Sequence, residues 1–353
     1  EQARMSHSKN HRVIVSRHGR PGVLLVVVED VPQPRAGEVR VKVQAAGVSA
    51  FDLIYRRWGW LPGSPRIPFT LGEDVVGTVD AVGEGVSSFS RGQMVAGGTW
   101  GLGIGGGYSE HVCLPASDLV PVPSGVDPAR AVCLVVNYLT AHQHLHAIGG
   151  ARAGERVLVH GAAGGVGTAL VELSRLAGLE VYGTASQRNV DFVESLGATS
   201  IDYAAEDFVT RIAALSGDGV DVVIDPVGGA GQLWRSYRAL RRGGRLVWLG
   251  SAAIDKQGLR VGPLSMLTVS ALRLLPDGKH VPRCPLMPEY AQRQLPWYRA
   301  TLSELLDLLA AGKLAPVVAE RVPLEHAARA HELLERGGHR GKVVLVTEAY
   351  GEL

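Results

Sequence analysis

Residues 155–167 read Glu-Arg-Val-Leu-Val-His-Gly-Ala-Ala-Gly-Gly-Val-Gly. The apolar run Val157–Val159 leads directly into a cluster of small residues, and apolar side chains then recur every three or four positions. This pattern predicts a strand, a tight turn and a helix. In a dinucleotide-binding fingerprint the small positions would be Ala162, Gly164 and Gly167, with alanine in place of the first glycine. The helix start would offer free N–H groups to a pyrophosphate.

Strand and helix patterns alternate after this turn. Strands are predicted at 179–185, 200–203, 220–225 and 244–249, and helices at 190–196 and 208–215. Such alternation favours the α/β class, with a parallel, doubly wound sheet that binds ligands at the carboxyl ends of its strands. An α/β domain without a nucleotide is the alternative.

The end of the second strand distinguishes NAD from NADP. An NAD site usually has an acidic residue about 20 positions after the glycines, which accepts a hydrogen bond from the ribose. Here the sequence is Gly183-Thr184-Ala185-Ser186-Gln187-Arg188, without an acid. Arg188 would attract a 2′-phosphate and Ser186 would add a hydroxyl donor. A solvated Arg188 is the alternative, but a cation at a helix start opposes the helix dipole. We therefore expect NADPH.

Composition limits the function classes. A length of 353 residues suggests two domains, and a net charge of +2 gives no case for nucleic acid. The three cysteines are widely spaced, which indicates neither a disulfide framework nor a structural zinc lobe. No run approaches the roughly 20 apolar residues of a membrane span. Residues 1–10 lack an apolar signal core, so we expect a cytoplasmic protein.

Residues 11–130 have a different pattern, with short strands separated by Pro and Gly turns. Strands are predicted at 23–28, 39–45, 75–82 and 93–96. They indicate a compact, mostly β domain. Beyond it we expect a helical connector at 128–150, helices at 301–312 and 325–335, and a last strand at 342–346. The apolar, Pro-rich segment 263–298 is expected first to continue the sheet to its edge and then to form a lid or a surface loop.

Several motifs together carry a specific resemblance. They are Ala-Gly-Val-Ser-Ala-Phe-Asp at 46–52, Gly-Glu-Asp-Val-Val-Gly at 72–77, Asn-Tyr-Leu-Thr-Ala at 137–141, Asp-Pro-Val-Gly-Gly at 225–229 and Gly-Lys-Val-Val-Leu at 341–345. With the glycine turn, they resemble the medium-chain dehydrogenase/reductase superfamily, and within it the zinc-independent quinone oxidoreductase branch with its vesicle-associated homologues. The resemblance covers residues 12–347.

The resemblance implies a domain organisation. A GroES-like catalytic domain would comprise residues 1–130 and 275–353, and a Rossmann NADPH-binding domain residues 131–274. The active site would lie in the interdomain cleft. Relatives pair the edges of their sheets, so a homodimer is expected.

No metal site is expected. Zinc-dependent relatives have a Cys and a His where this chain has Ser49 and Glu73, and Asp74 replaces the motif's Glu. A serine is a poor zinc ligand compared with a thiolate. The alternative is a metal shared by His142 and His146, four apart on a predicted helix, but a third ligand is missing from the sequence.

Without a Lewis acid, oxidation of a simple alcohol is disfavoured. The resemblance implies hydride transfer from NADPH to a small-molecule quinone or to an α,β-unsaturated carbonyl. One rival is an enoyl-thioester reductase, for which a basic groove with Arg241, Arg242 and Arg273 would be expected. The other is a non-enzymatic NADPH-binding protein, which the weak net charge makes a poor candidate for RNA.

Site residues follow from matching positions. Arg188 stands where relatives have a Lys for the 2′-phosphate, and Ser49 replaces the family's usual Asn. Trp60 aligns with a family Tyr but cannot donate a phenolic proton. Asp52 matches a family Asp that is either catalytic or a brace for the loop. The expected catalytic set is Ser49, Asp52 and Trp60. The expected cofactor set begins with Asn137 and Thr140 by the nicotinamide, and Gly250 and Ser251 would line the same pocket. Backbone N–H groups of Gly164, Gly165 and Val166 would bind the pyrophosphate. Ser186, Arg188 and Tyr203 would lie near the 2′-phosphate, and Thr184 precedes them at the end of the second strand.

Overall fold

The computed structural model describes residues 9–58, 66–100, 105–250, 258 and 260–352. Contacts group the chain into two compact units. Unit 1 contains Glu1–Val136, Ala291–Gly337 and Lys342–Leu353, and unit 2 contains Asn137–Tyr290 and Gly338–Gly341. Unit 1 is therefore assembled from both ends of the chain. The domain boundaries expected after residues 130 and 274 stay predictions.

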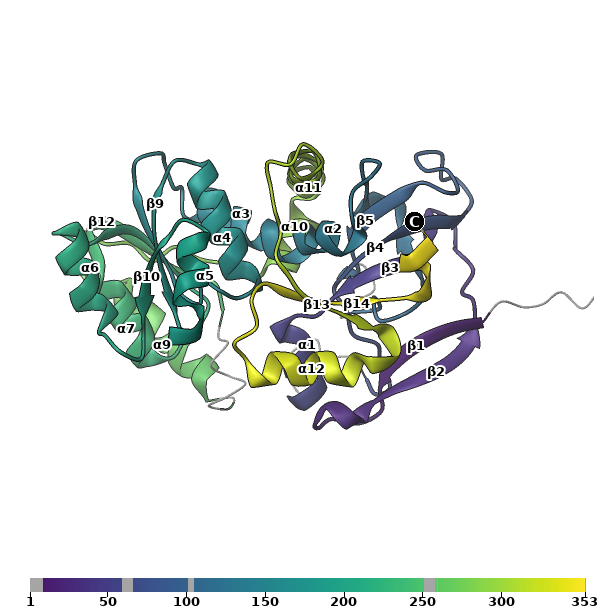
Figure 1. The fold of residues 1–353 in the computed structure, drawn as a ribbon, viewed down its shortest axis with the longest axis horizontal. Helices are drawn as coiled ribbons and strands as arrows, with labels where there is room; N and C mark the ends of the chain where they lie inside the picture. Colours follow the sequence, from purple (N-terminus) through teal and green to yellow (C-terminus); the bar gives the residue numbers. More distant parts are fainter. Residues whose placement is uncertain (1–8, 59–65, 101–104, 251–257, 259, 353) are drawn as a thin grey trace, which may run out of the picture. The chain divides into compact units, whose positions relative to one another are not determined.

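Unit 2 is built on a parallel five-stranded sheet with the order β10-β9-β8-β11-β12. The strands are β8 (Arg156–Val159), β9 (Glu180–Ala185), β10 (Thr199–Asp202), β11 (Val220–Asp225) and β12 (Leu240–Trp248). Figure 1 shows α4 (Gly165–Leu176) and α5 (Val190–Ser195) on one side of this sheet, and α6 (Phe208–Ser216) and α7 (Ala230–Arg238) on the other. The predicted doubly wound α/β fold is confirmed. The strand order reverses at β8, where such sheets bind their ligands.

The central strands of unit 2 are apolar along their whole length because helices cover both faces. Val157, Leu158 and Val159 of β8 are 0% exposed, as are Val222, Val223 and Ile224 of β11. At about 25 cal/mol per Å² of buried apolar surface, this core is the main stabilising contribution to the unit. Its rigid strands fix the position of the turn that follows β8.

The segment after β12 differs from the sequence expectation. Residues predicted to extend the sheet form a helix instead, α9 (Val261–Leu272). A short apolar run does not distinguish a buried strand from a helix by its periodicity. Residues Val261, Ser265, Val269 and Leu272 recur at helical spacing and are buried, and the Ser265 hydroxyl accepts the Gly229 N–H at 2.8 Å. The later part of the segment contains α10 (Met287–Arg293).

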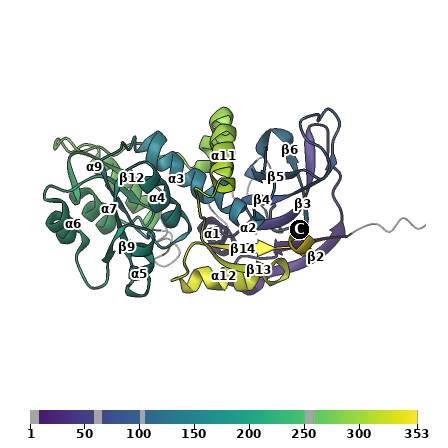
Figure 2. The ribbon, with the colours of Figure 1, turned by 45° about the horizontal axis from the view of Figure 1, so that its top comes forward.

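Unit 1 is mostly β, as expected. Its main sheet has the order β13-β14-β3-β4-β5-β7, and β6 also pairs with β3. The strands are β3 (Glu38–Gly47), β4 (Asp74–Val82), β5 (Met94–Gly98), β6 (His111–Pro115), β7 (Leu119–Pro121), β13 (Val318–Pro323) and β14 (Lys342–Val346). β1 (Lys9–Val15) and β2 (Leu24–Asp30) form a separate antiparallel pair. Figure 2 shows β13 and β14, from the end of the chain, within the same layer as β3.

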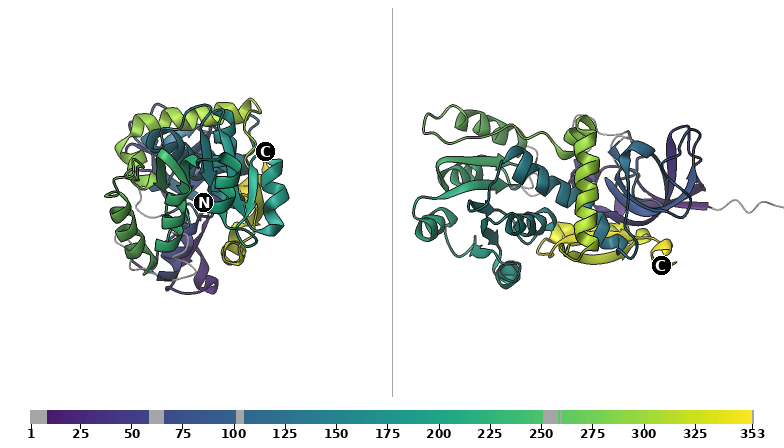
Figure 3. Two further views of the ribbon diagram at one scale, coloured as in Figure 1. Left: turned by 90° about the vertical axis from the view of Figure 1, so that its left-hand side faces the viewer. Right: turned by 90° about the horizontal axis from the view of Figure 1, so that it is seen from above.

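Helices complete unit 1. The structure has α1 (Ala50–Trp58), α11 (Leu295–Ala310) and α12 (Ala327–Arg336). Figure 3 shows α11 as one continuous yellow-green helix. The predicted connector is helical in four pieces, α2 (Pro128–Cys133), η4 (Leu134–Tyr138), α3 (Leu139–His142) and η5 (Gln143–Ile148). Among the described residues no helix has both the length and the apolar character needed to cross a membrane.

Candidate active site

The glycine turn after β8 is held in a defined shape. Gly161 begins it with a φ of +66°, a conformation that favours glycine, and its carbonyl oxygen accepts the Gly164 N–H at 3.0 Å. A Cβ on Gly167 would lie 2.1 Å from that same oxygen, so only glycine lets α4 begin so close to the strand end. The positive-φ glycine of the turn is thus Gly161, which lies outside the three-position fingerprint.

The turn offers space at Gly164 and donors farther along. The Gly164 N–H donates to the Gly161 carbonyl within the turn, and its expected contact with a phosphate stays a prediction. Within the described part of the chain, a Cβ added there would meet only the Gly161 oxygen, at 3.4 Å, so the backbone is open to a close approach. The first bond inside α4 runs from the Thr168 N–H to Gly164, which leaves the N–H groups of Val166 and Gly167 without a helical acceptor.

Asn137 lies against this turn. A Cβ on Gly165 would be 2.5 Å from Asn137 Nδ2, so the small residue makes room for the amide. Asn137 and Thr140 are 6% and 7% exposed, and the Thr140 carbonyl contacts His144 Nδ1 at 2.8 Å. The structure therefore brings Asn137 to the glycine turn and places Thr140 one helical turn farther along the same segment.

Thr184 braces the turn from the end of β9. Its Oγ1 accepts the Gly161 N–H at 3.2 Å and contacts His160 Nδ1 at 3.0 Å. His160 Nε2 in turn contacts Ser236 Oγ at 3.0 Å, and that hydroxyl donates to Asp225 Oδ2 at 2.7 Å. All of these side chains are buried, so the network links three strands and α7 beneath the turn. Sequence reasoning missed His160 and Ser236, for which no motif gives a signal.

Arg188 follows β9 and is exposed, with its guanidinium against the backbone of Gly338. Its carbonyl oxygen accepts Arg340 Nη2 at 2.9 Å, and Arg340 Nε donates to Asn189 Oδ1 at 3.0 Å. Arg340 also lies over the Phe192 ring, 5.0 Å from its centroid. In the part of the chain that the structure describes, neither guanidinium has a carboxylate partner. Two positive charges therefore stand at the carboxyl end of β9.

The remaining predicted cofactor residues are distributed around this edge. Tyr203 is 59% exposed, which excludes a core aromatic, and its N–H donates to the Ala185 carbonyl at 3.2 Å. Ser186 is half-buried, and Gly250 accepts the indole N–H of Trp248. Trp60 and Ser251 lie outside the described residues.

Ser49 and Asp52, two of the expected catalytic residues, lie in unit 1 and contact each other. Asp52 Oδ2 accepts the Ser49 N–H at 2.7 Å, and Asp52 Oδ1 accepts the Gly72 N–H at 3.0 Å. The carboxylate is 1% exposed, and burial raises its pKa to about 6. Both oxygens therefore hold two loops together, which favours the bracing role of Asp52 over the catalytic one.

Glu73 is the residue whose environment the sequence did not reveal. The Ser49 hydroxyl donates to Glu73 Oε2 at 3.2 Å, and Asp52 and Asp74 lie nearby. Burial, followed by repulsion from those two carboxyl groups, raises the pKa of Glu73 to about 8. Asp74 itself pairs with Lys342, whose Nζ is 2.9 Å from Asp74 Oδ2.

Comparison with known proteins places this geometry in a family. Residues 35–124 match the alcohol dehydrogenase GroES-like domain, and residues 196–345 match the zinc-binding dehydrogenase family. The rat synaptic vesicle membrane protein VAT-1 homolog is 34% identical, over 89% of this chain and 78% of its own length. The quinone oxidoreductase of Lama guanicoe is 33% identical, over 94% of this chain and 96% of its own length. The chain belongs to the medium-chain dehydrogenase/reductase superfamily.

A solved structure supports this membership. The Escherichia coli quinone oxidoreductase, complexed with NADPH, superposes with a TM-score of 0.81 at 28% identity and covers 95% of this chain and 99% of its own. This medium-chain dehydrogenase/reductase is an oxidoreductase with the expected pairing of a GroES-like domain and a Rossmann domain.

The metal question in this dehydrogenase/reductase depends on the ligand set. Within the described ranges no three His, Cys, Asp or Glu side chains gather as a metal would require. The rings of His142 and His146 lie 4.8 Å apart by their centroids, without a third described ligand. Burial, with His146 adding to it, lowers the pKa of His142 to about 4.

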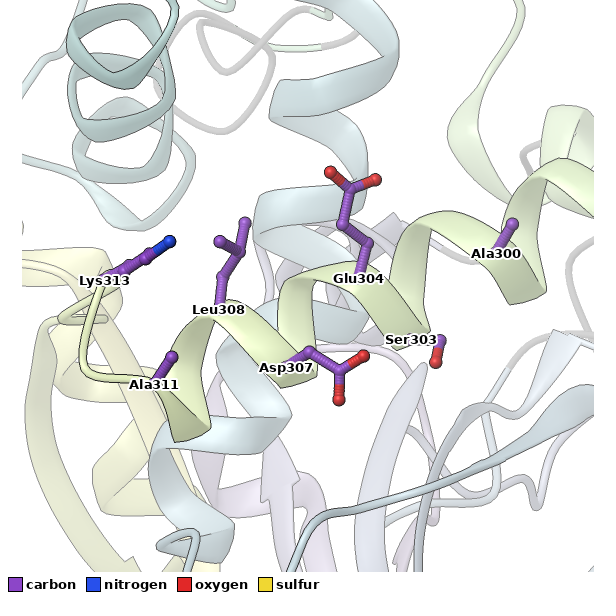
Figure 4. Close-up of a pocket in the computed structure, with 7 residues that line it drawn as sticks. All are labelled: Ala300, Ser303, Glu304, Asp307, Leu308, Ala311 and Lys313. Carbon is purple, nitrogen blue, oxygen red and sulfur yellow. The ribbon is translucent and has the colours of Figure 1, made fainter.

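A surface hollow in unit 1 is not part of the candidate site. It follows α11 and is lined by Ala300, Ser303, Glu304, Asp307, Leu308, Ala311 and Lys313 (Figure 4). Its polar side chains, Ser303, Glu304, Asp307 and Lys313, are all exposed. None of the residues expected at the active site lines it.

Proposed function

We propose that this oxidoreductase is a zinc-independent reductase that uses NADPH to reduce a quinone or an α,β-unsaturated carbonyl. The observation that carries the proposal is the carboxyl end of β9, where Arg188 and Arg340 lack described carboxylate partners. The alternative cofactor NADH would leave these charges without a 2′-phosphate. Bound NADPH would supply the hydride.

The residues present fit the cofactor. The open backbone at Gly164 leaves room for a pyrophosphate, and the N–H groups of Val166 and Gly167 are available at the start of α4. Arg188, Ser186 and Tyr203 would hold the 2′-phosphate, and Asn137 and Thr140 would lie toward the nicotinamide. Arg340 would reinforce Arg188 through its bond to the Arg188 carbonyl.

Zinc independence rests on the chemistry of the donor set. Ser49 and Glu73 occupy the positions at which zinc-dependent relatives have a thiolate and an imidazole. A hydroxyl and a carboxyl group with a raised pKa are poor zinc ligands at neutral pH. A quinone or enone delocalises the negative charge that hydride transfer creates, so it needs no Lewis acid. The protein then has to hold donor and acceptor at reaction distance.

The relatives and the structure favour a quinone reductase over an enoyl-thioester reductase. The relatives named quinone oxidoreductase, and the Escherichia coli protein solved with NADPH, support a quinone acceptor. An enoyl-thioester reductase is weakened because Arg241 pairs with Asp221, and Arg273 bonds to the carbonyls of Val281 and Pro282. These guanidinium groups are already engaged and form a poor basic groove. A non-enzymatic NADPH-binding protein is the second rival.

Loss of nicotinamide absorbance tests the proposal. NADPH and NADH are each mixed with the protein and a panel of quinones, simple enones and one enoyl thioester. Turnover with NADPH and a quinone or enone, and much slower turnover with NADH, is expected. Turnover of the thioester alone would favour the first rival, and binding of NADPH without any turnover would favour the second.

A homodimer and a cytoplasmic location belong to the same proposal. The expected dimer depended on pairing of sheet edges through the segment after β12. Because the segment forms α9 and not an edge strand, that argument for a dimer no longer holds. α9 instead exposes Leu264, Met266 and Leu267 by 52%, 63% and 68%. Light scattering that gives twice the chain mass would support the dimer, and a monomer mass would contradict it. Cell fractionation tests the location.

A further inference from the structure

Three buried carboxyl groups form a cluster in unit 1, and their hydrogen-bonding and charged partners are unevenly distributed among them. It consists of Asp52, Glu73 and Asp74, which are 1%, 8% and 0% exposed. Asp74 has the ammonium of Lys342 at 2.9 Å, and Asp52 accepts two backbone N–H groups. Among the residues that the structure describes, the hydroxyl of Ser49, at 3.2 Å, is the one hydrogen-bond partner of the Glu73 carboxyl. A buried carboxylate needs a cation or several donors, so Glu73 is the member least able to ionise.

The charged and titratable groups that face Glu73 also favour its protonated form. Asp52 and Tyr55 come from α1, Asp74 from β4, and Lys342 from β14. Two of these four are acids, and the one cation is already paired with Asp74. The resulting repulsion adds to burial, and the pKa of about 8 for Glu73 means that this carboxyl holds its proton at neutral pH.

We propose that Glu73 stores the proton that completes the reduction and delivers it to the substrate through the hydroxyl of Ser49. The proposal rests on the proposed function, which leaves an anionic oxygen on a substrate that has accepted a hydride. Ser49 is then the catalytic residue, and Glu73 acts through it.

Each proton that the relay donates is replaced by the next group in line. The O–H bond of Ser49 breaks as its proton forms an O–H bond with the anionic oxygen of the reduced substrate. The carboxyl O–H of Glu73 breaks as its proton replaces the one that Ser49 has lost. Glu73 is left as a carboxylate and takes a proton from water before the next turnover. The hydride comes from NADPH, so no further reductant is needed.

The hydrogen-bonding capacity of Ser49 suits this role. A hydroxyl has one donor and two acceptor positions. Ser49 Oγ accepts the Asp52 N–H at 3.2 Å and lies 3.2 Å from Glu73 Oε2. When Glu73 is protonated, its carboxyl O–H can donate across that contact to the second acceptor position of Ser49, which releases the hydroxyl proton for a substrate. Ser49 is half-buried whereas Glu73 is buried, so the hydroxyl is the more accessible end of the relay.

Variants with a quinone or enone that the wild-type protein reduces test the relay. The rate constant of the wild type should fall as pH rises through about 8, because Glu73 must be protonated. Glu73→Gln should lower kcat on the order of 100-fold and abolish this fall. Ser49→Ala should lower kcat to a similar level. Glu110→Gln, in the same unit and outside the cluster, is the matched control and should keep the wild-type rate and profile.

Infrared spectroscopy provides a readout without turnover. The carbonyl stretch of a protonated carboxyl group should be present at pH 7 in the wild type and in Ser49→Ala, and absent from Glu73→Gln. If the stretch does not depend on Glu73, or if Glu73→Gln keeps the wild-type profile, the relay alone is overturned. If the wild type reduces no acceptor in the panel, the proposed function fails and the relay fails with it. Should Glu73→Gln not fold, Ser49→Ala with normal kcat overturns the relay.

Discussion

Lys342 Nζ lies 2.9 Å from Asp74 Oδ2, and the two side chains are 1% and 0% exposed. The pair joins β14, from the end of the chain, to β4, from its first third. Gly47 of β3 lies between them, since a Cβ there would be 2.1 Å from Lys342 Cε and 2.4 Å from Asp74 Oδ1. The glycine therefore makes the space that this buried ion pair occupies.

Lys342→Met should destabilise the protein strongly. It leaves the carboxyl of Asp74 buried without its cation, which costs about 3–5 kcal/mol in comparable cases. Lys9→Met is the matched control, because Lys9 and Asp30 form a pair at 2.7 Å with side chains 57% and 72% exposed. It should cost less than about 1 kcal/mol. Chemical denaturation measures both, and equal losses would show that the buried pair contributes no more than a surface one.

Alanine at two glycines of the turn should affect two different properties, the stability of the protein and its affinity for NADPH. Gly167→Ala places a Cβ 2.1 Å from the Gly161 oxygen and 2.8 Å from Ala162 Cα, so the free energy of unfolding should fall by several kcal/mol. The methyl group of Gly164→Ala meets no described atom closer than 3.4 Å, so this variant should leave stability nearly unchanged. It should nevertheless weaken NADPH binding, because the methyl group fills space near the phosphates. Thermal unfolding and titration with NADPH distinguish the two; wild-type affinity in Gly164→Ala would contradict the turn as a phosphate site.

Arg188→Ala should weaken NADPH roughly 10- to 100-fold, as expected for one charged hydrogen-bonding group, and should change NADH binding little. Arg340→Ala should have a smaller effect in the same direction, since Arg340 also anchors the loop through Asn189. Dissociation constants for both cofactors measure the difference. An equal loss for NADPH and NADH would exclude a 2′-phosphate contact for Arg188.

His144 should make the protein less stable in acid. Burial lowers the pKa of His144 to about 4, from 6.5 when unfolded. The unfolded chain then binds the proton first, so stability present above pH 6.5 is lost as pH falls toward 4, by about 3 kcal/mol. His144→Leu should flatten this slope, whereas His326→Gln, at an exposed histidine, should not. Unfolding free energies at pH 7, 6, 5 and 4 provide the test, and an unchanged slope in His144→Leu would contradict it.

Local sequence patterns predicted most elements of unit 2. β11 has the expected bounds, Val220–Asp225, and α5 and α6 differ by one residue at the end, because their periods and caps are encoded locally. α9 was predicted wrongly for the same reason, since a short apolar run fits a strand as well as a helix. The sequence did not show that the turn uses the Gly164 N–H for its own bond to the Gly161 carbonyl.

The site depends on contacts that a linear reading does not contain. The sequence shows Glu73 only as a replaced zinc ligand, whereas its high pKa arises from Asp52 and Asp74, placed by a helix and a strand. Arg340 meets Arg188 although 152 positions separate them. His160 and Ser236 meet beneath the turn in the same way. The order of the strands in the sheet brings such residues together. Sequence motifs do not encode that order directly and indicate it only by identifying the family.

The position of β14 between β13 and β3 has a consequence for how the protein is made. A ribosome synthesises β3 and β4 long before Lys342–Val346, so the sheet of unit 1 stays incomplete until nearly the whole chain has emerged. Residues 137–290 are continuous in sequence and can form their own sheet in the meantime. Until β14 is made, Asp74 lacks its lysine, and the edge of β3 that β14 will occupy is free to pair with another chain.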